Sequence, residues 1–563
     1  MTSGTSPTGT SPDRSTASAA TAVVIDDGPP PMGSRLPTVV RVTSHVTVWC
    51  SVLAGLAVEL SYGWRPVGDN AAIASRAYQS LTAHPPVLGL LSTASGHGHA
   101  VYDPGPLLFW LLAVPAHLDP TQGILWGAAL LAGAVLSTAV EAVWSARLWA
   151  GCGVIAFMVV DMFWLTPAVF ENISWNAYFP LPFLIASLAL AWVVASGKLG
   201  WWPVLVFTAS VAAQSHLLLA LPAALLALTA PAAGVALGSR PARWRWIWAG
   251  IIVGLASWAA PIAQQLTGHP GNVSSMVSSQ SGQTKLGLSF ALSAFGRIGR
   301  PFPIWLTHQP TNILTLDSFE TRAGMGAGIV LLVLVIVIVA WAASTRRRSL
   351  AAASAVALVA SVAAVVSYAV VPSASAFDLL YLLNLLWPLG IAIWAVVAWA
   401  VVDAVLAWRV RRTGTATRPH AVTAAVGVVG VVLVTALVAG LVGVARFRPA
   451  EDTVSWDTAD ATSVAQVVRA VERVAPKGPV VVSVHDPAQP GLSTIWISEG
   501  VAWQLRADGW APGLAGGEAL YTGLSLPTGT RYTLVLVEVH GSTVSSVTAT
   551  TCRTGIQRCE VAS

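Results

Sequence analysis

The chain has 563 residues, of which 55% are hydrophobic and only 10% are charged. Soluble domains carry about 25% charged residues, so this composition excludes an ordinary soluble protein and indicates an integral membrane protein. The net charge of +5 comes largely from short basic clusters between apolar segments, a distribution typical of membrane topology, and we expect no nucleic-acid partner.

The N-terminal residues 1–38 are rich in Ser, Thr, Pro and Ala, and we expect them to form a disordered cytoplasmic tail. The first apolar segment, residues 39–60, is long enough to span a bilayer, which requires about 20 apolar residues. Because no short apolar stretch with a cleavage site opens the chain, we expect this segment to act as an uncleaved signal anchor.

Ten further apolar segments follow, which predicts a polytopic α-helical membrane domain of about eleven spans over residues 39–448. These segments cover residues 121–145, 148–167, 178–196, 201–214, 216–235, 246–266, 324–343, 350–371, 377–405 and 420–445. With the N-terminus in the cytoplasm, the basic clusters between spans all fall on the cytoplasmic side. The sequence therefore predicts a multi-pass protein of the cell membrane with residues 62–120 and 267–323 as outer loops.

Two apolar stretches need separate interpretation. Residues 104–118 form an apolar stretch that is too short to span comfortably, so we expect a helix along or dipping into the outer membrane face. Residues Gly324–Gly328 contain three glycines at the start of a span, which indicates close helix packing.

The polar tail, residues 449–563, is predicted to be a small extracytoplasmic α/β domain. Its pattern is a helix, a strand, a helix, a strand and a last strand, over residues 462–474, 479–484, 493–507, 532–539 and 542–550. Cys552 and Cys559 close a short loop in this tail, and an extracytoplasmic location would allow them to form a disulfide.

Asp69 is the first candidate for chemistry, because it follows Gly68 just beyond the first span. A carboxylate at this place can serve as a general base toward an acceptor hydroxyl. Asp69 also precedes a helical pattern that starts at Ala71, so the alternative is a helix cap. The two roles are compatible.

Several other polar residues of the outer loops are candidates for substrate binding. Arg76 lies seven residues after Asp69, about two helical turns away on the same face, and could hold a lipid phosphate or pair with Asp69. His97 and His99 have only a weak metal-binding pattern; we predict no metal site and leave a divalent cofactor open. The other candidates are His84, Asp103, Asn172, Trp175, Asn176, Gln214, His216, Arg297, Arg300 and Glu320.

The last three of these lie in the loop 267–323, whose Ser, Gly and Gln content is typical of a mobile lid. Arg297 and Arg300 could face a phosphate, although a solvated helix face would also place them there. The chain contains no Walker A lysine, no HExxH and no GxSxG, which argues against an ATP-driven pump, a zincin protease and an α/β-hydrolase.

The layout resembles the GT-C superfamily of membrane glycosyltransferases, and more closely a glycosyltransferase-39-like, actinobacterial type. The resemblance rests on Gly68-Asp69, Pro85-Pro86 with Gly89, the stretch Asp103 to Trp110, Trp175-Asn176 and Gln214-Ser215-His216. It covers about residues 40–450.

The resemblance implies transfer of a sugar from a polyprenyl-phosphate donor to a cell-envelope glycan, lipid or protein acceptor on the outer membrane face. It assigns the base to Asp69. Many such enzymes have a second acid beside the first, whereas this chain has Asn70; Asp103 or Glu320 could supply a second carboxylate.

Two alternatives belong to other functional classes. A transporter or flippase for lipid-linked sugars would need ionisable groups within the spans, for which Glu141, Asp161 and Asp403 are the candidates. A non-catalytic envelope scaffold would use its outer domain to bind a partner.

Overall fold

In the computed structural model, the described residues are 36–61, 63–95, 98–162, 173–237, 244–300, 322–373, 382–413, 454–486, 492–514, 522–540 and 543–554. Most of the predicted N-terminal tail and the predicted span at residues 420–445 lie outside these ranges. So do four of the predicted site residues, His97, Asn172, Glu320 and Cys559.

Within the described residues, seven helices are long and apolar enough to cross a membrane. They are α1 (Leu36–Ser61), α4 (Gly123–Ser145), α9 (Leu217–Ala236), α10 (Trp244–Thr267), α13 (Arg322–Ser344), α14 (Arg348–Ala369) and α16 (Leu386–Thr413). The chain is therefore a multi-pass membrane protein by length and apolar character of its helices.

Three more predicted spans coincide with shorter helices, α5 (Trp149–Val160), α7 (Pro180–Ala195) and α8 (Trp202–Ser215). A helix of 16 residues such as α7 reaches about 24 Å, less than the roughly 30 Å of a hydrocarbon core. The count of eleven spans remains a prediction. The stretch predicted to lie at the outer face forms α3 (Leu107–Leu118), whose 12 residues are too few to span.

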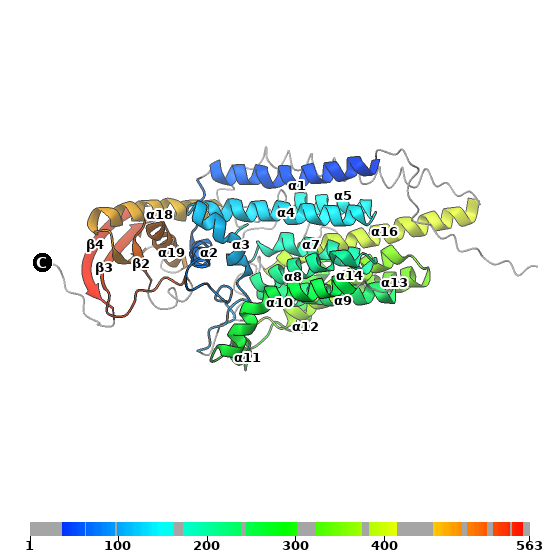
Figure 1. The fold of residues 1–563 in the computed structure, drawn as a ribbon. Helices are drawn as coiled ribbons and strands as arrows, with labels where there is room; N and C mark the ends of the chain where they lie inside the picture. Colours follow the sequence, from blue (N-terminus) through cyan, green and yellow to red (C-terminus); the bar gives the residue numbers. More distant parts are fainter. Residues whose placement is uncertain are drawn as a thin grey trace, which may run out of the picture.

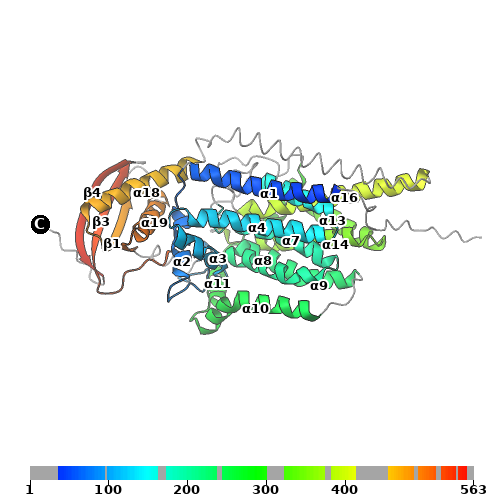
Figure 2. The same cartoon turned by 45° about the horizontal axis from the view of Figure 1, so that its top comes forward.

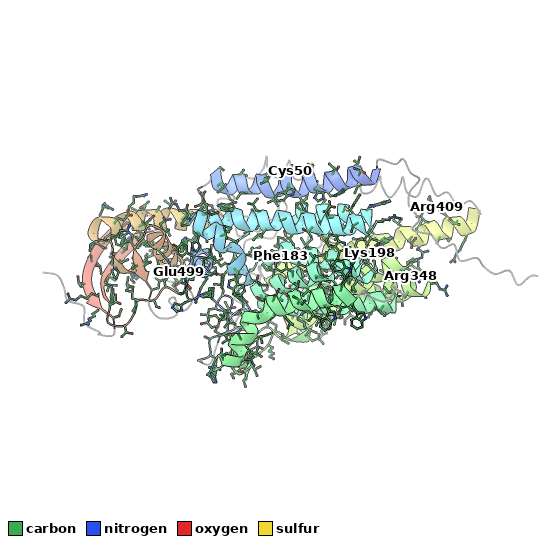
Figure 3. All side chains as sticks on the ribbon, viewed as in Figure 1. Cys50, Phe183, Lys198, Arg348, Arg409 and Glu499 are labelled. Carbon is green, nitrogen blue, oxygen red and sulfur yellow. The ribbon has the colours of Figure 1, made fainter. Side chains whose placement is uncertain are left out.

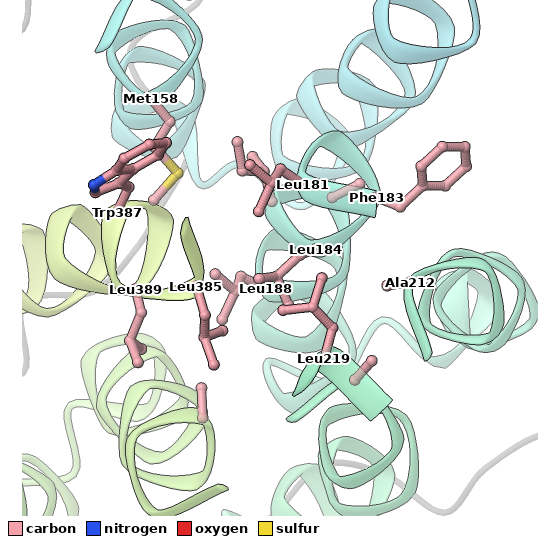
Figure 4. Packing of buried hydrophobic residues seen from close by; sticks show 14 of the residues in the cluster. Met158, Leu181, Phe183, Leu184, Leu188, Ala212, Leu219, Leu385, Trp387 and Leu389 are labelled. Atoms are coloured by element: carbon pink, nitrogen blue, oxygen red, sulfur yellow. The ribbon is translucent and has the colours of Figure 1, made fainter. Parts of the chain in front are cut away.

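The helices form an elongated bundle, with a small sheet domain at one end beside α2 (Gly68–Gln79) (Figures 1 and 2). The buried helix α7 packs against α4, α8, α9 and α14 and forms the centre of the bundle. Figure 4 shows Leu181, Leu184 and Leu188 of α7 among residues from neighbouring helices. Because lipid tails are as apolar as leucine, this packing is stabilised mainly by close van der Waals contact.

Helices α12 (Gly287–Gly296) and α13 approach each other closely through glycines. A Cβ atom on Gly328 would lie 2.2 Å from the carbonyl oxygen of Leu292, and one on Gly296 would lie 2.1 Å from that of Gly324. The predicted close packing at Gly324–Gly328 is confirmed for Gly328. Gly326, in contrast, has open space at this position.

Four short elements complete the described membrane domain. Helix α11 (Asn272–Gln280) follows α10. The 3-10 turn η3 (Arg297–Gly299) follows α12, and the 3-10 turn η6 (Leu383–Leu385) precedes α16. A third 3-10 turn, η2 (Leu199–Trp201), precedes α8. A single extended residue, His216, separates α8 from α9, which pack against each other.

The C-terminal domain has a four-stranded mixed sheet in the order β2-β1-β3-β4. Its elements are α18 (Val454–Val474), β1 (Pro479–His485), α19 (Leu492–Ala507), β2 (Ala511–Gly513), β3 (Arg531–His540) and β4 (Thr543–Arg553). Strand β1 pairs in parallel with β2 and β3, and β3 pairs antiparallel with β4. The predicted helix and strand order is confirmed, with the three-residue β2 added.

The glycine contact between α12 and α13 yields a stability prediction. In Gly328→Ala the new methyl group must push α13 away from the Leu292 carbonyl, whereas Gly326→Ala meets no atom within 4 Å. We expect Gly328→Ala to lower the apparent Tm of the detergent-solubilised protein by several degrees, and Gly326→Ala to leave it unchanged or raise it, because alanine favours the helix by about 1 kcal/mol. Equal Tm values for the two variants would show that the close approach of α12 and α13 does not contribute to thermal stability.

Candidate active site

Asp69 lies in the first turn of α2, and this helix begins at Gly68, three residues before the helical pattern that the sequence predicts from Ala71. Gly68 is the first helical residue and Val67 is the N-cap, which makes no side-chain capping bond. Asp69 therefore does not occupy the cap position. An acidic side chain in the first turn still stabilises the helix dipole, by about 0.3–1 kcal/mol.

Gly68 itself explains why the helix starts here. Its φ is +51°, and a Cβ atom would lie 2.9 Å from the Trp496 ring of α19. Glycine meets both requirements, because it adopts the left-handed region without strain and lets another group approach its backbone closely. The residue before Asp69 is thus fixed by the C-terminal domain.

Three consecutive residues, Ser174 to Asn176, donate side-chain hydrogen bonds to residues 69, 70 and 103. The Trp175 Nε1–H donates a short hydrogen bond to the Asp69 carboxylate. The Ser174 hydroxyl donates to Asn70 Oδ1 at 2.7 Å, and the Asn176 amide donates to Asp103 Oδ2 at 2.9 Å. The segment that follows α5 in the chain therefore joins the two acidic residues of the loop.

Asp103 is the buried member of this group, with 3% of its surface exposed. Besides Asn176 it accepts a hydrogen bond from the backbone N–H of Leu217, at the start of α9, at 3.1 Å. Burial raises the pKa of Asp103 to about 7; the two donors oppose this shift, and the negative charge of Asp69 adds to it. The two carboxyl groups are therefore close enough to affect each other's ionisation.

Gln214 and His216 lie next to this group and hold helices together. Gln214 is fully buried and donates from Nε2 to the carbonyl oxygen of Ser257 in α10 at 2.7 Å. The backbone carbonyl oxygen of Gln214 accepts from the N–H of Gly105, two residues after Asp103, at 3.4 Å. His216 caps α9 by accepting from the Leu218 N–H at 3.3 Å. Both residues support the site from the side of α8–α10.

Arg76 is half-buried and faces Gln79 of the same helix and Gly523 of the C-terminal domain. Burial lowers the pKa of Arg76, and the nearby Tyr102 opposes this shift. His84 is exposed in a turn. We find no metal-binding group of three or more His, Cys, Asp or Glu side chains within the described ranges.

Arg297 and Arg300 lie together at the end of α12. Burial and the charge of Arg300 lower the pKa of Arg297 to about 10, so the two guanidinium groups repel each other at short range. Two adjacent cations at the end of a helix can bind an anion such as a phosphate. Helix α12 packs against α13 and α14.

The C-terminal domain packs directly on α2, a feature that the sequence reasoning missed. Arg65 donates to Gln504 Oε1 at 3.0 Å, Trp503 Nε1–H donates to the carbonyl oxygen of Pro120 at 2.8 Å, and Gln79 donates to the carbonyl oxygen of Gly523 at 3.0 Å. The available signal was the spacing of Trp496, Gly500 and Trp503, which share one face of α19. In the same domain Cys552 is disulfide-bonded; its predicted partner, Cys559, is not among the described residues.

Comparison of the chain with protein-family models, with curated proteins and with solved structures finds no match. The structure brings Asp69, Asp103, Trp175 and Asn176 into one hydrogen-bonded group, beside Gln214 and His216.

The raised pKa of Asp103 predicts a pH dependence of stability. The folded protein keeps a proton on this carboxyl up to about pH 7, whereas an unfolded chain releases it near pH 3.9. The contribution of this group is therefore fully present below about pH 4 and is lost as the pH rises toward 7.

We expect the difference in apparent Tm, wild type minus Asp103→Asn, to decrease as the pH rises from about 5 to about 8. Thermal unfolding in detergent at both pH values measures it. Glu472→Gln, an exposed acid of α18, is the control and should show no such change. A Tm difference that is constant or grows with pH would mean that Asp103 is ionised in the folded protein throughout.

Proposed function

We propose that this protein is a membrane glycosyltransferase that moves a sugar from a polyprenyl-phosphate donor to a hydroxyl group of a cell-envelope acceptor. The observation that carries this proposal is the pair of interacting carboxyl groups, Asp69 and Asp103, held by Trp175 and Asn176 at the end of the helix bundle. A general base needs a fixed carboxylate in a partly enclosed place, and this pair provides one.

Asp69 takes the role of general base. It accepts the proton of the acceptor hydroxyl while that oxygen forms a bond to C1 of the sugar, and the bond from C1 to the phosphate oxygen breaks with its electron pair on the leaving polyprenyl phosphate. The Trp175 N–H fixes the orientation of the Asp69 carboxylate. Asp103, with a pKa near 7, limits the negative charge that accumulates beside the base.

The donor phosphate needs a cation at the membrane surface. Arg76, two turns along α2 from Asp69, is the candidate nearest to the base in sequence, and Arg297 with Arg300 forms a second cationic group. A guanidinium can hold two phosphate oxygens at once. Either cationic group can hold the donor phosphate, and proton transfer to Asp69 requires no divalent metal.

The distribution of basic residues supports placing the C-terminal domain outside the cytoplasm. Lys198, Arg348 and Arg409 lie at one end of the molecule, and the C-terminal domain with Glu499 lies at the opposite end (Figure 3). Positive residues favour the cytoplasmic side of a membrane. In this orientation the Asp69–Asp103 pair is on the outer side, where nucleotide sugars are absent and a lipid-linked donor is the available one.

Two of the three acidic residues that would suggest a transporter have structural partners. Glu141 accepts two hydrogen bonds from Arg41 at 2.7 Å and one contact from His45 at 2.6 Å, and Asp403 is ion-paired with Arg347. Paired charges of this kind hold helices together at a lower cost than isolated ones. Asp161, which is buried at the end of α5, is the remaining candidate for the transport alternative.

The catalytic assignment predicts the effect of Asp69→Asn. Asparagine can still accept a hydrogen bond from Trp175 but cannot take the acceptor proton, so we expect the rate of sugar transfer to fall by about 10²–10⁴ with little change in Tm. Purified protein with a radiolabelled polyprenyl-phosphate sugar and an envelope acceptor fraction measures the rate. Glu472→Gln serves again as the acid-to-amide control.

An Asp69→Asn variant that transfers as fast as the wild type would remove Asp69 from the chemistry. If neither protein transfers sugar, but both move a lipid-linked sugar across the membrane of proteoliposomes, the transport alternative holds instead.

A further inference from the structure

A cavity of about 230 Å³ lies between the first outer loop and the end of α10 with α11. Its lining includes His99 and Tyr102 from the loop, Gln264 from α10, and Asn272 and Ser275 from α11. None of its lining residues is Asp, Glu, Lys or Arg. It is separate from the Asp69–Trp175 contact, and the proposed chemistry does not use it.

The wall of this cavity is held by hydrogen bonds that use both sides of one amide. Asn272 Oδ1 accepts from the backbone N–H of Tyr102 at 3.0 Å, and its Nδ2 donates to the carbonyl oxygen of Tyr102 at 2.9 Å. The backbone N–H of Asn272 donates to Gln264 Oε1 at 3.1 Å. The loop, α10 and α11 are thus joined at one point, and the cavity has a fixed shape.

The groups that remain for a ligand are polar but carry no fixed charge. The side-chain amide of Asn272 is hydrogen-bonded to Tyr102. The Gln264 oxygen already accepts from the Asn272 N–H, so the group that Gln264 offers to a ligand is its NH₂ donor. Ser275 adds a hydroxyl, His99 an imidazole and Tyr102 an aromatic ring. An ionic ligand would lose its hydration without gaining a counter-charge, whereas hydroxyl groups can pair with these donors and acceptors.

We propose that this cavity binds one neutral sugar ring of the acceptor glycan. Pockets for drug-sized ligands have volumes of about 300–1,000 Å³, so a smaller cavity such as this one suits a single ring with its hydroxyl groups. An aromatic ring beside hydrogen-bonding groups presents an apolar face and polar edges together, which matches the two faces of a pyranose. This inference rests on the proposed function.

The cavity also has a structural connection to the carboxyl pair. Tyr102 pairs with Leu91 as an isolated β-bridge, so the backbone at residues 101–103 is extended. Side chains alternate along extended backbone, so Tyr102 faces the cavity while Asp103 faces Asn176 and Leu217. A sugar ring against Tyr102 would therefore hold the segment that places Asp103 near Asp69, with the acceptor chain leading toward the base.

Binding of neutral trisaccharides to the full-length protein in detergent tests the proposal directly. Mannotriose and maltotriose are the probes, trigalacturonate is the anionic comparator, and saturation-transfer NMR and calorimetry give the affinity. Two substitutions change the cavity, Tyr102→Leu and Ser275→Ala, and both leave the Asn272 bonds to the Tyr102 backbone in place. Ser278→Ala, at an exposed serine of the same helix, is the matched control.

We expect at least one neutral trisaccharide to bind with a Kd below about 10 mM, and Tyr102→Leu to raise that Kd by about tenfold, with a smaller increase for Ser275→Ala and none for Ser278→Ala. In the transfer assay Tyr102→Leu should raise the KM for the acceptor and leave kcat unchanged. Equal Tm values for wild type and variants exclude a folding defect.

The proposal is overturned if neither neutral probe binds below this limit, if trigalacturonate binds as tightly as they do, or if Tyr102→Leu binds like the wild type. Its failure is distinct from failure of the proposed function. Saturable binding that depends on Tyr102, in a protein without transfer activity, would retain the sugar site and remove the transferase. Transfer that depends on Asp69 but not on Tyr102 would retain the transferase and remove the sugar site.

Discussion

The hydrogen bonds made by Ser174, Trp175 and Asn176 are the interaction on which the rest of the candidate site depends. Two acidic side chains near each other repel, and a buried carboxyl such as Asp103 is costly without donors. Two consecutive residues of one turn, Trp175 and Asn176, each donate to one of the two acids and so hold them at a set separation. That turn therefore joins α2 to the segment at Asp103.

The second constraint is the contact of the C-terminal domain with α2. The ring of Trp496 lies over Gly68, and Gly500 leaves room for the backbone of Pro66 and the side chain of Val67. The domain therefore packs on the residues that directly precede Asp69. An outer domain that only bound a distant partner would not need to pack so closely on the start of this helix, so its contact is consistent with a part in shaping the site.

Much of this arrangement follows from the sequence, and the rest required tertiary packing. Apolar length placed the long helices, and period-two and helical patterns placed the strands and helices of the tail. The sequence also singled out Asp69, Asp103, Trp175 and Asn176. It could not show that α2 starts at Gly68, because a left-handed glycine under a tryptophan from another domain is a long-range contact. The hydrogen bond between Tyr102 and Asn272 could not be predicted either, because 170 positions of the chain separate these residues.

The central claim is that the Asp69–Trp175 group faces the reacting sugar. A cryo-electron microscopy structure with a non-transferable polyprenyl-phosphate sugar analogue tests it most directly. We predict density for the sugar beside the Asp69 carboxylate, with the phosphate against Arg76 or against Arg297 and Arg300. Density for the whole headgroup inside the helix bundle near Asp161, with none beside Asp69, would contradict the claim.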